Sequence, residues 1–425
     1  LDGENSAKRH WVPSPTTISG PPTHSHHTLE RGLPPLCCRL SGAADVCLSP
    51  LTLRTWTCIY NMHHLVDEKR RMEGQEATRQ GAETGAVAAL QAGAPFEEWR
   101  YTQRTLQEDD VEVELTHCGV CHSDLHAWKG EFPGCIYPLV PGHEGVGIVK
   151  RVGSAVTDVS VGQVVGIGPH SGCCQTCNWC KLYQDVMCPK KVVTYGGRDQ
   201  LGNITYGCFG YNITVSAHKA IPIPEGMDPA EAAPLLCAGV TTFTPLVENM
   251  KPHYKTCAVV GVGGLGHLAI QFAAAIGLEV TAISRSPEKE EEALSFGAKH
   301  FLLSSDEEAV AAAKDSFDMV LNTVPGNINM DMYLKMLAPL GAFVFLGVCI
   351  KSEFSPLPVL MKKLTICGGL IGGTQDTKDM LKFCAENNIR PKIEKLPFTP
   401  EGVNEAMRKI EDGSVRYRSV LCRDL

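Results

Sequence analysis

One stretch of the chain combines side chains that bind metals with side chains that move protons. It reads C-G-V-C-H-S-D-L-H and, after a gap, G-H-E. The candidate groups are the thiol of Cys121, the hydroxyl of Ser123, the carboxylate of Asp124 and the imidazoles of His126 and His143. Zinc favours cysteine sulfur and histidine nitrogen, and a catalytic zinc keeps three protein ligands so that a fourth position stays open. The stretch therefore predicts a catalytic zinc site.

Cys121 and His143 supply two of the three predicted ligands, so the third must come from elsewhere in the chain. Cys237, in the run A-P-L-L-C-A-G, is the best candidate because proline and glycine bracket it at an expected domain junction. The alternative is that Cys121 and His143 are ordinary buried residues, since free cysteine is among the most buried residue types. The remaining motifs of the chain bear on this choice.

A second group of cysteines lies in the run C-C-Q-T-C-N-W-C and ends, seven residues later, in another cysteine. Four thiolates at this spacing close a tetrahedral structural zinc site with no open position. We expect the ligands to be Cys174, Cys177, Cys180 and Cys188, with Cys173 surplus. The alternatives are an iron–sulfur cluster, which also uses four cysteines, and a coincidental run.

A glycine-rich turn stands between a short apolar run and a helical pattern. C-A-V-V precedes the turn, A-I-Q-F-A-A-A-I-G follows it, and the turn contains Gly261, Gly263, Gly264 and Gly266. In this context the bare amides of the helix N-terminus can receive a pyrophosphate. The motif therefore predicts a dinucleotide site, with a plain tight turn as the alternative.

The following strand, E-V-T-A-I, leads into Ser284, Arg285 and Ser286. An NAD site would place Asp or Glu here to bind the ribose 2′-hydroxyl, whereas a nearby Arg accommodates a 2′-phosphate. We therefore predict NADP(H) as the cofactor. Lys289 and Thr241 complete the predicted cofactor-binding set.

Two patterns of secondary structure must position these groups. Before Cys237, alternating runs such as V-E-V-E-L-T and V-G-Q-V-V-G-I-G predict a small β-barrel-like domain, with the metal-binding stretch on loops between its strands. After Cys237, apolar strands alternate with helices, which predicts a doubly wound parallel sheet and an α/β chain. The final segment returns to a strand–helix–strand pattern, and we expect it to fold back onto the first domain.

The composition is that of an ordinary globular protein, with 425 residues, 44% of them hydrophobic and 20% charged. A net charge of −8 argues against nucleic acid or an anionic membrane as a partner. The chain has no apolar run of about 18 residues, so we expect no membrane span. The 19 cysteines are odd in number and cluster at metal spacing, which favours a reducing compartment over a disulfide framework. Residues 1–85 show no helical or strand periodicity, and we expect a disordered or unrelated extension there.

The order of these motifs resembles that of the zinc-dependent medium-chain alcohol dehydrogenases, and within them the cinnamyl alcohol dehydrogenases and NADP-dependent aldehyde reductases. T-H-C-G-V-C-H-S-D-L-H, V-P-G-H-E, A-P-L-L-C-A-G, V-G-G-L-G-H and V-R-Y-R carry the resemblance. It implies a GroES-like β-barrel catalytic domain formed by residues 86–238 and 373–425. A Rossmann NADP-binding domain would occupy residues 239–372.

The resemblance also implies roles for individual residues. Cys121, His143 and Cys237 would hold the catalytic zinc, in addition to one structural zinc per chain. Glu144 would approach the catalytic metal, and Asp124 would orient a ligand imidazole.

The implied reaction is hydride transfer between NADP(H) and a primary alcohol or aldehyde, of cinnamyl type or from a broad aliphatic and aromatic range. Ser123 would take the hydroxyl proton, and His126 would carry it onward. A cytoplasmic homodimer is the implied form of the enzyme. A zinc-thiolate redox-sensing protein that keeps a nucleotide-binding fold is the rival interpretation, but it has no need of an open zinc position or a proton path.

Overall fold

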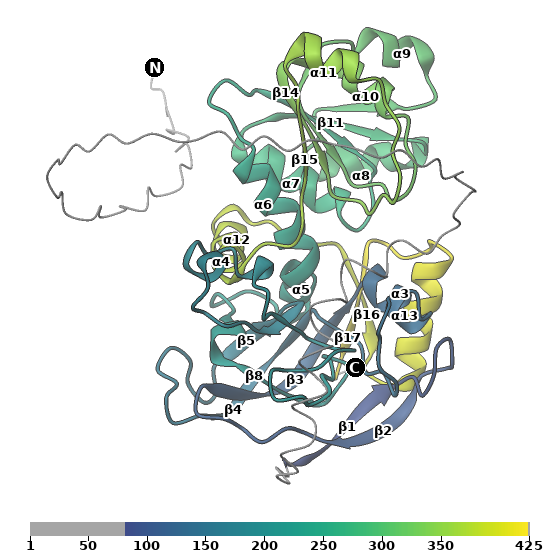
Figure 1. The fold of residues 1–425 in the computed structure, drawn as a ribbon. Helices are drawn as coiled ribbons and strands as arrows, with labels where there is room; N and C mark the ends of the chain where they lie inside the picture. The colour runs from purple at the N-terminus through teal and green to yellow at the C-terminus, as the bar shows by residue number, and fades with distance from the viewer. Residues whose placement is uncertain (1–80, 424–425) are drawn as a thin grey trace, which may run out of the picture. The chain divides into compact units, whose positions relative to one another are not determined.

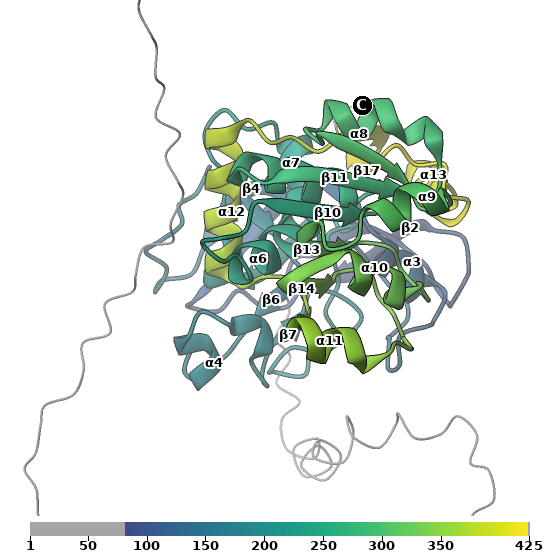
Figure 2. The same cartoon turned by 90° about the horizontal axis from the view of Figure 1, so that it is seen from above.

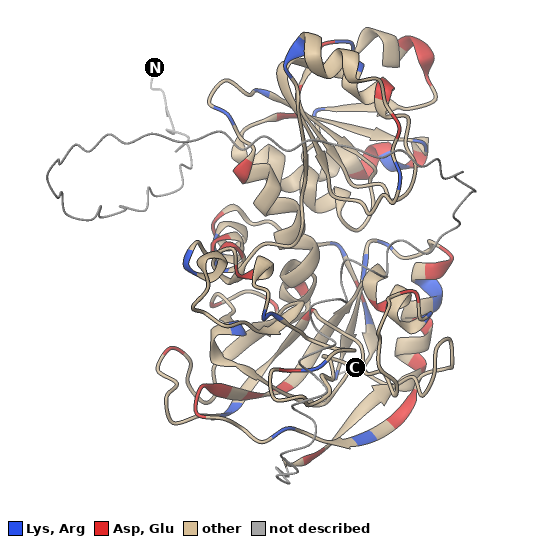
Figure 3. Ribbon diagram, in the orientation of Figure 1, with Lys and Arg blue, Asp and Glu red and all other residues tan. Residues whose placement is uncertain are grey.

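The computed structural model describes residues 81–423, so the prediction of an extension over residues 1–85 lies outside the described residues as far as residue 80. The end of that prediction is wrong, because strand β1 (Glu83–Ala88) already begins at Glu83. The described chain is built around a seven-stranded sheet and a six-stranded sheet (Figure 1). Acidic and basic residues are interspersed over the elements of both sheets (Figure 3). The two predicted patterns of secondary structure correspond to these two sheets.

The seven-stranded sheet has the order β16-β17-β3-β4-β5-β9, and β8 also pairs with β3. Its core strand is β3, in which Val111, Val113 and Leu115 alternate into the interior and are fully buried. β17 pairs antiparallel with β3, so the C-terminal segment joins the sheet formed by the first part of the chain. The strands are β3 (Asp110–Val120), β4 (Gly145–Val152), β5 (Val164–Ile167), β8 (Asn212–Ser216), β9 (Ala220–Pro222), β16 (Ile393–Pro397) and β17 (Arg418–Cys422).

Two smaller strand pairs and one helix complete this part. β1 (Glu83–Ala88) pairs with β2 (Glu97–Thr102), and β6 (His170–Gly172) pairs with β7 (Val192–Val193). Helix α13 (Pro400–Glu411) packs its apolar face into the same core as β1 and β3.

The six-stranded sheet is parallel throughout and has the order β12-β11-β10-β13-β14-β15. Numbered from its own first strand, this is the order 3-2-1-4-5-6 of dinucleotide-binding folds. The crevice for the cofactor is therefore expected at the carboxyl ends of β10 and β13, where the order reverses. The strands are β10 (Thr256–Val260), β11 (Glu279–Ser284), β12 (His300–Leu303), β13 (Phe317–Asn322), β14 (Leu337–Phe345) and β15 (Thr365–Gly368).

Both faces of the parallel sheet are covered by helices. In β10, Cys257 and Val259 belong to one buried cluster, and Ala258 and Val260 belong to another. The first cluster contains residues of α6 (Val240–Glu248), α7 (Gly266–Ile276), α8 (Glu290–Ser295) and α12 (Thr374–Asn387). The second includes residues of α9 (Glu307–Ala312), α10 (Met330–Met336) and α11 (Pro356–Lys362). Figure 2 shows α6, α7 and α12 along one side of the strands, with α9 and α10 on the other.

One continuous helical stretch, Pro229–Glu248, connects the two sheets. It consists of α5 (Pro229–Pro234), a π-helical turn at Leu235–Gly239, and α6. By length and composition it could cross a membrane, but 83% of its most apolar window is buried inside the protein, which is the environment of a core helix. Cys237 lies on the π-helical turn, a feature that often occurs at functional sites.

Candidate metal centre and cofactor site

The first predicted metal ligand lies where β3 ends. Cys121 is the N-cap of helix α3 (His122–Trp128), and the Asp124 carboxylate accepts the Cys121 backbone N–H at 2.9 Å. This stretch was expected on a loop, and that expectation is wrong for its helical part. The helix is short, and a capping interaction between Cys121 and Asp124 defines its start instead of an apolar periodicity.

Asp124 also fixes the second predicted ligand. It is fully buried, and its Oδ1 accepts the Gly142 backbone N–H at 3.0 Å and lies 3.0 Å from His143 Nδ1. Gly142 has a φ of +94°, and a Cβ there would lie 2.6 Å from the Phe209 ring. Because Asp124 occupies Nδ1 of His143, Nε2 is the nitrogen that remains for a metal. A carboxylate orients a metal-binding histidine in this arrangement.

The ligand atoms of Cys121, His143, Glu144 and Cys237 lie within 4.8 Å of one another. Two sulfurs and one imidazole nitrogen fit the donor set that zinc prefers. The hydrogen bond from Cys237 is the main cause that lowers the pKa of the Cys121 thiol well below its usual range. The thiolate form that a metal binds is therefore favoured at Cys121.

Glu144 connects this centre to the C-terminal strand. Its carboxylate is fully buried and forms an ion pair with Arg418, whose side chain is only 7% exposed. Burial raises the pKa of Glu144 to about 7, although the charge of Arg418 opposes this rise. Glu144 Oε2 is a buried acceptor that lacks a hydrogen-bond partner among the described residues, and Glu144 is one of the residues grouped around the metal centre.

Ser123 and His126 both lie on α3, the helix that begins after the predicted ligand Cys121. The Ser123 hydroxyl lies 3.9 Å from the Cys121 sulfur. His126 is 45% exposed, and its Nδ1 lies 2.5 Å from Glu131 Oε2. The helix therefore carries one hydroxyl beside the metal centre and one imidazole at the surface.

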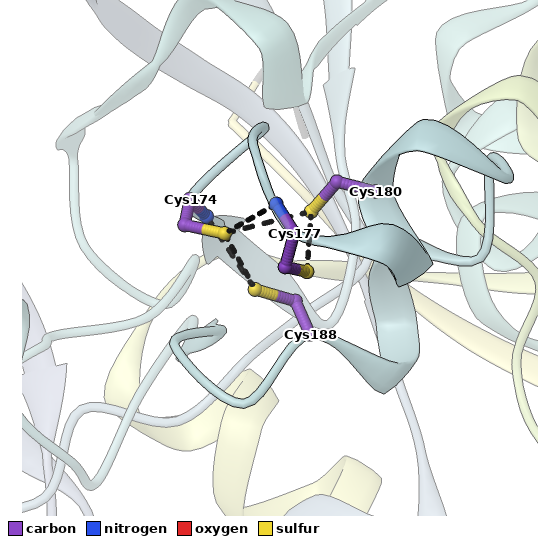
Figure 4. Close-up of side chains that lie close together, drawn as sticks. All are labelled: Cys174, Cys177, Cys180 and Cys188. Atoms are coloured by element: carbon purple, nitrogen blue, oxygen red, sulfur yellow. Dashed lines mark hydrogen bonds between the residues drawn. The ribbon is translucent and has the colours of Figure 1, made fainter.

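The four predicted structural cysteines converge on one point (Figure 4). The sulfurs of Cys174 and Cys188 are 3.4 Å apart, and those of Cys177 and Cys180 are 3.6 Å apart. Backbone N–H groups, with that of Thr176 the strongest, lower the pKa of Cys174 to about 5. Convergent sulfurs with a favoured thiolate fit a closed tetrahedral zinc site.

A third group, formed by Cys173, Asp185 and His218, also brings its ligand atoms within 4.8 Å. Asp185 is already saturated, because it accepts hydrogen bonds from His218, from the hydroxyl and backbone N–H of Thr374, and from Lys219. The Lys219 side chain is buried, with 5% exposure, and its ammonium would repel a metal cation. We assign this group to a set of ion pairs and hydrogen bonds that joins the cysteine lobe, residues 173–188, to the start of α12.

The glycine turn has the geometry that a dinucleotide needs. Gly261 follows β10 with a φ of +91°, and a Cβ at Gly266 would lie 1.9 Å from the Gly261 carbonyl oxygen. Only glycine permits that approach of α7 to the strand. A Cβ at Gly263 would meet nothing within 4 Å, so the backbone is open at that point.

The predicted 2′-phosphate residues stand at the end of the neighbouring strand. β11 ends at Ser284, as the sequence predicts, and the Ser284 hydroxyl accepts the Ser286 backbone N–H at 3.2 Å. The Lys289 ammonium lies 4.7 Å from the centre of the Tyr417 ring. Thr241, the last member of the predicted set, is buried in the first turn of α6.

Arg418 lies between the glycine turn and the metal centre. A Cβ at Gly264 would lie 3.4 Å from Arg418 Nη1, while Arg418 Nη2 donates to Glu144. Sequence reasoning noted the run V-R-Y-R but assigned Arg418 no role. The available signal was a charged residue at the start of R-S-V-L-C, a strand that is buried along its whole length.

Comparisons with known proteins agree with this geometry. Residues 107–225 match the alcohol dehydrogenase GroES-like domain, and residues 264–386 match the zinc-binding dehydrogenase family. The chain is 43% identical to the probable formaldehyde dehydrogenase AdhA of Bacillus subtilis, over 80% of this chain and 97% of that protein. It is 39% identical to the aldehyde reductase AdhA of Synechocystis, over 79% of this chain and 98% of that protein.

Solved structures show the same relationship. A cinnamyl alcohol dehydrogenase of Sorghum bicolor superposes with a TM-score of 0.76 at 35% identity, covering 80% of this chain and 98% of that one. A cinnamyl alcohol dehydrogenase of Helicobacter pylori, solved with NADP(H), gives a TM-score of 0.74 at 30% identity, covering 81% of this chain and 99% of that one. The chain belongs to the zinc-binding medium-chain alcohol dehydrogenases, with a GroES-like catalytic part and a Rossmann cofactor part.

Proposed function

We propose that the protein interconverts aldehydes and primary alcohols with NADP(H), at a zinc site formed by Cys121, His143 and Cys237. The observation that carries this proposal is the position of Arg418, which lies beside the glycine turn at Gly264 and donates a hydrogen bond to the metal-site carboxylate Glu144. The predicted cofactor and metal sites are therefore neighbours, as hydride transfer between them requires. When bound, zinc polarises the oxygen of the substrate and NADP(H) donates or accepts the hydride.

The side chains of α3 supply the proposed proton path. The Ser123 hydroxyl, beside the Cys121 sulfur, takes the proton of the alcohol in oxidation and returns it in reduction. His126 then exchanges this proton with solvent, because its ring is partly exposed and contacts Glu131 at the surface. Asp124 has a different role: its buried hydrogen bonds hold Cys121 and His143 in position.

We propose that Arg285 selects NADPH over NADH, with Ser284 and Ser286 as further donors to the 2′-phosphate. A hydrogen bond to a charged group contributes about 1.5–3 kcal/mol, and about 1.4 kcal/mol corresponds to tenfold in affinity. The wild-type enzyme should therefore prefer NADPH by roughly ten- to a hundredfold in kcat/KM. Combining Ser284→Asp with Arg285→Ala should reverse the preference. A wild-type preference for NADH would refute this assignment.

The activity itself is tested by the consumption of NADPH with a panel of aliphatic and aromatic aldehydes. Cys237→Ala should abolish turnover while NADPH binding, followed by fluorescence, persists. Cys349→Ala is the matched control, because it removes a partly exposed thiol from the cofactor part of the protein. Full turnover by the Cys237 variant would exclude Cys237 as a ligand. Failure of the zinc-loaded wild type to reduce any aldehyde of the panel would refute the proposed function.

We also propose that the protein is a homodimer whose partner covers the region beside the edge strand β15. Large apolar side chains in and near α11 are 61–94% exposed there, and an apolar surface of this kind marks an interaction site. They are Val348, Ile350, Leu357, Leu360 and Met361. Light scattering should give twice the chain mass, and Leu360→Glu should shift it towards the monomer. A monomeric wild type would contradict the proposal.

The proposed compartment is the cytoplasm. Every cysteine from Cys118 to Cys422 is a free thiol. Free thiols in this number persist in reducing compartments, where disulfides are rare.

A further inference from the structure

Tyr195 contacts the predicted metal centre from a separate part of the chain. Its ring centroid lies 5.7 Å from that of His143, with the two planes tilted by 38°. Its hydroxyl lies near the Asp124 carboxylate, whose charge adds to burial in raising the pKa of that hydroxyl well above its usual range, and Asp124 also accepts the backbone N–H groups of Cys121 and Gly142. Tyr195 therefore contacts both members of the carboxylate–histidine pair that orients the metal ligand.

The backbone around Tyr195 is held by hydrogen bonds on both sides. The Thr194 hydroxyl donates to the Gly168 carbonyl at 2.6 Å, and the Gly196 N–H donates to the Thr205 carbonyl at 3.0 Å. Gly196 has a φ of +70°, a conformation that few other residues adopt. The ring is therefore presented to His143 by a rigid segment of chain.

This segment is continuous with the base of the cysteine lobe. Cys188 closes the lobe, β7 follows, and Tyr195 stands two residues beyond Val193, the last residue of β7. Val193 pairs with His170 of β6, the strand that leads into the lobe. The strands before and after the lobe, β6 and β7, are therefore paired with each other just before the chain reaches Tyr195.

We infer that Tyr195 is a positioning residue that links the cysteine lobe to the Asp124–His143 pair of the catalytic centre. The inference rests on the proposed function, in which His143 binds the catalytic zinc. The hydroxyl restrains the Asp124 carboxylate, and the ring limits rotation of the imidazole. Loss of such an outer partner typically weakens metal binding by about 10- to 100-fold.

The test compares Tyr195→Phe, which removes only the hydroxyl, with Tyr195→Leu, which removes the ring. Each variant is loaded with cobalt at the catalytic site, and its affinity is measured by competition with a chelator while the visible spectrum reports ligand geometry. Tyr183→Phe is the matched control, because Tyr183 lies on the cysteine lobe, away from His143, and is 57% exposed. We expect Tyr195→Phe to bind the catalytic metal about 10- to 100-fold more weakly with an altered spectrum, and the control to match the wild type.

Unchanged metal affinity and spectrum in both Tyr195 variants would overturn the inference. It would also be overturned if Tyr195→Phe lost both metals together with a lowered melting temperature, since that would show a role in folding alone. These measurements do not depend on turnover. An enzyme without aldehyde reductase activity would refute the proposed function and still leave the effect of Tyr195 on the metal measurable.

Discussion

Replacing Arg418 with methionine should destabilise the protein by about 3–5 kcal/mol, because it leaves the buried Glu144 carboxylate without its partner. The side chains of Arg418 and Glu144 are 7% and 0% exposed, so water cannot solvate the carboxylate that remains. The pKa of Glu144, already about 7 beside Arg418, rises further without it, and the buried carboxylate must take up a proton. Methionine keeps most of the apolar contacts of the arginine stem. The expected loss therefore reports the unpaired carboxyl group more than lost packing.

The double variant Glu144→Gln/Arg418→Met separates these contributions. Removing both partners of a buried pair costs much less than removing one, because no isolated charge remains. The double variant should thus be at least about 2 kcal/mol more stable than the sum of the two single losses predicts, whereas independent sites add within about 0.5 kcal/mol.

The assay is urea unfolding followed by tryptophan fluorescence, with metal content measured for every variant. Arg151→Met serves as the control, because Arg151 is 58% exposed in its pair with Glu112. Its removal should cost less than about 1 kcal/mol. Additive losses in the Glu144 and Arg418 variants, within about 0.5 kcal/mol, would refute the reasoning.

Three further outcomes are expected. Cys177→Ser should lose one zinc per chain and lower the melting temperature, because a structural metal contributes folding free energy; unchanged metal content and stability would contradict this. Ser123→Ala should lower kcat by about 10²- to 10⁴-fold with zinc retained, and an unchanged kcat would remove Ser123 from the proton path. Burial lowers the pKa of His267 to about 3, whereas an exposed histidine has a pKa of about 6.5. As the pH falls below about 6.5, the unfolded chain takes up a proton that the folded chain excludes, so stability should fall by about 1.4 kcal/mol per pH unit. His267→Gln should reduce this slope in thermal melts between pH 7 and 5, and equal slopes would contradict the assignment.

The dinucleotide-binding part was predictable because its signals are local. An apolar run, a glycine turn and a helical pattern adjoin one another in the sequence, and the structure has β10, the turn and α7 in that order. Gly277 ends α7 with a φ of +103°, the conformation that glycine adopts at a helix C-terminus. Each of these features depends on residues only a few positions apart.

The short helix α3 was harder to predict because it has seven residues and no apolar stripe. Its start depends on one side chain, Asp124, which sequence reasoning had assigned to the metal centre. The same carboxylate caps the helix and orients His143, so one residue has a structural and a positioning task. A prediction that assigns Asp124 to the metal centre alone does not reveal that it also caps the helix.

The residues that contact the predicted metal ligands were harder to predict from the sequence than the ligands themselves, and the reason is chemical. Metal binding restricts a position to a few residue types, so Cys121, His143 and Cys237 could be predicted as candidate ligands before any contact was known. Holding a metal ligand in position requires only a hydrogen-bond donor or an aromatic ring at the correct place, and many residue types can supply one. Arg418 reaches Glu144 from 274 residues away, and Tyr195 reaches His143 from beyond the cysteine lobe. Only the folded chain brings such partners together, which is why their roles follow from contacts and not from spacing.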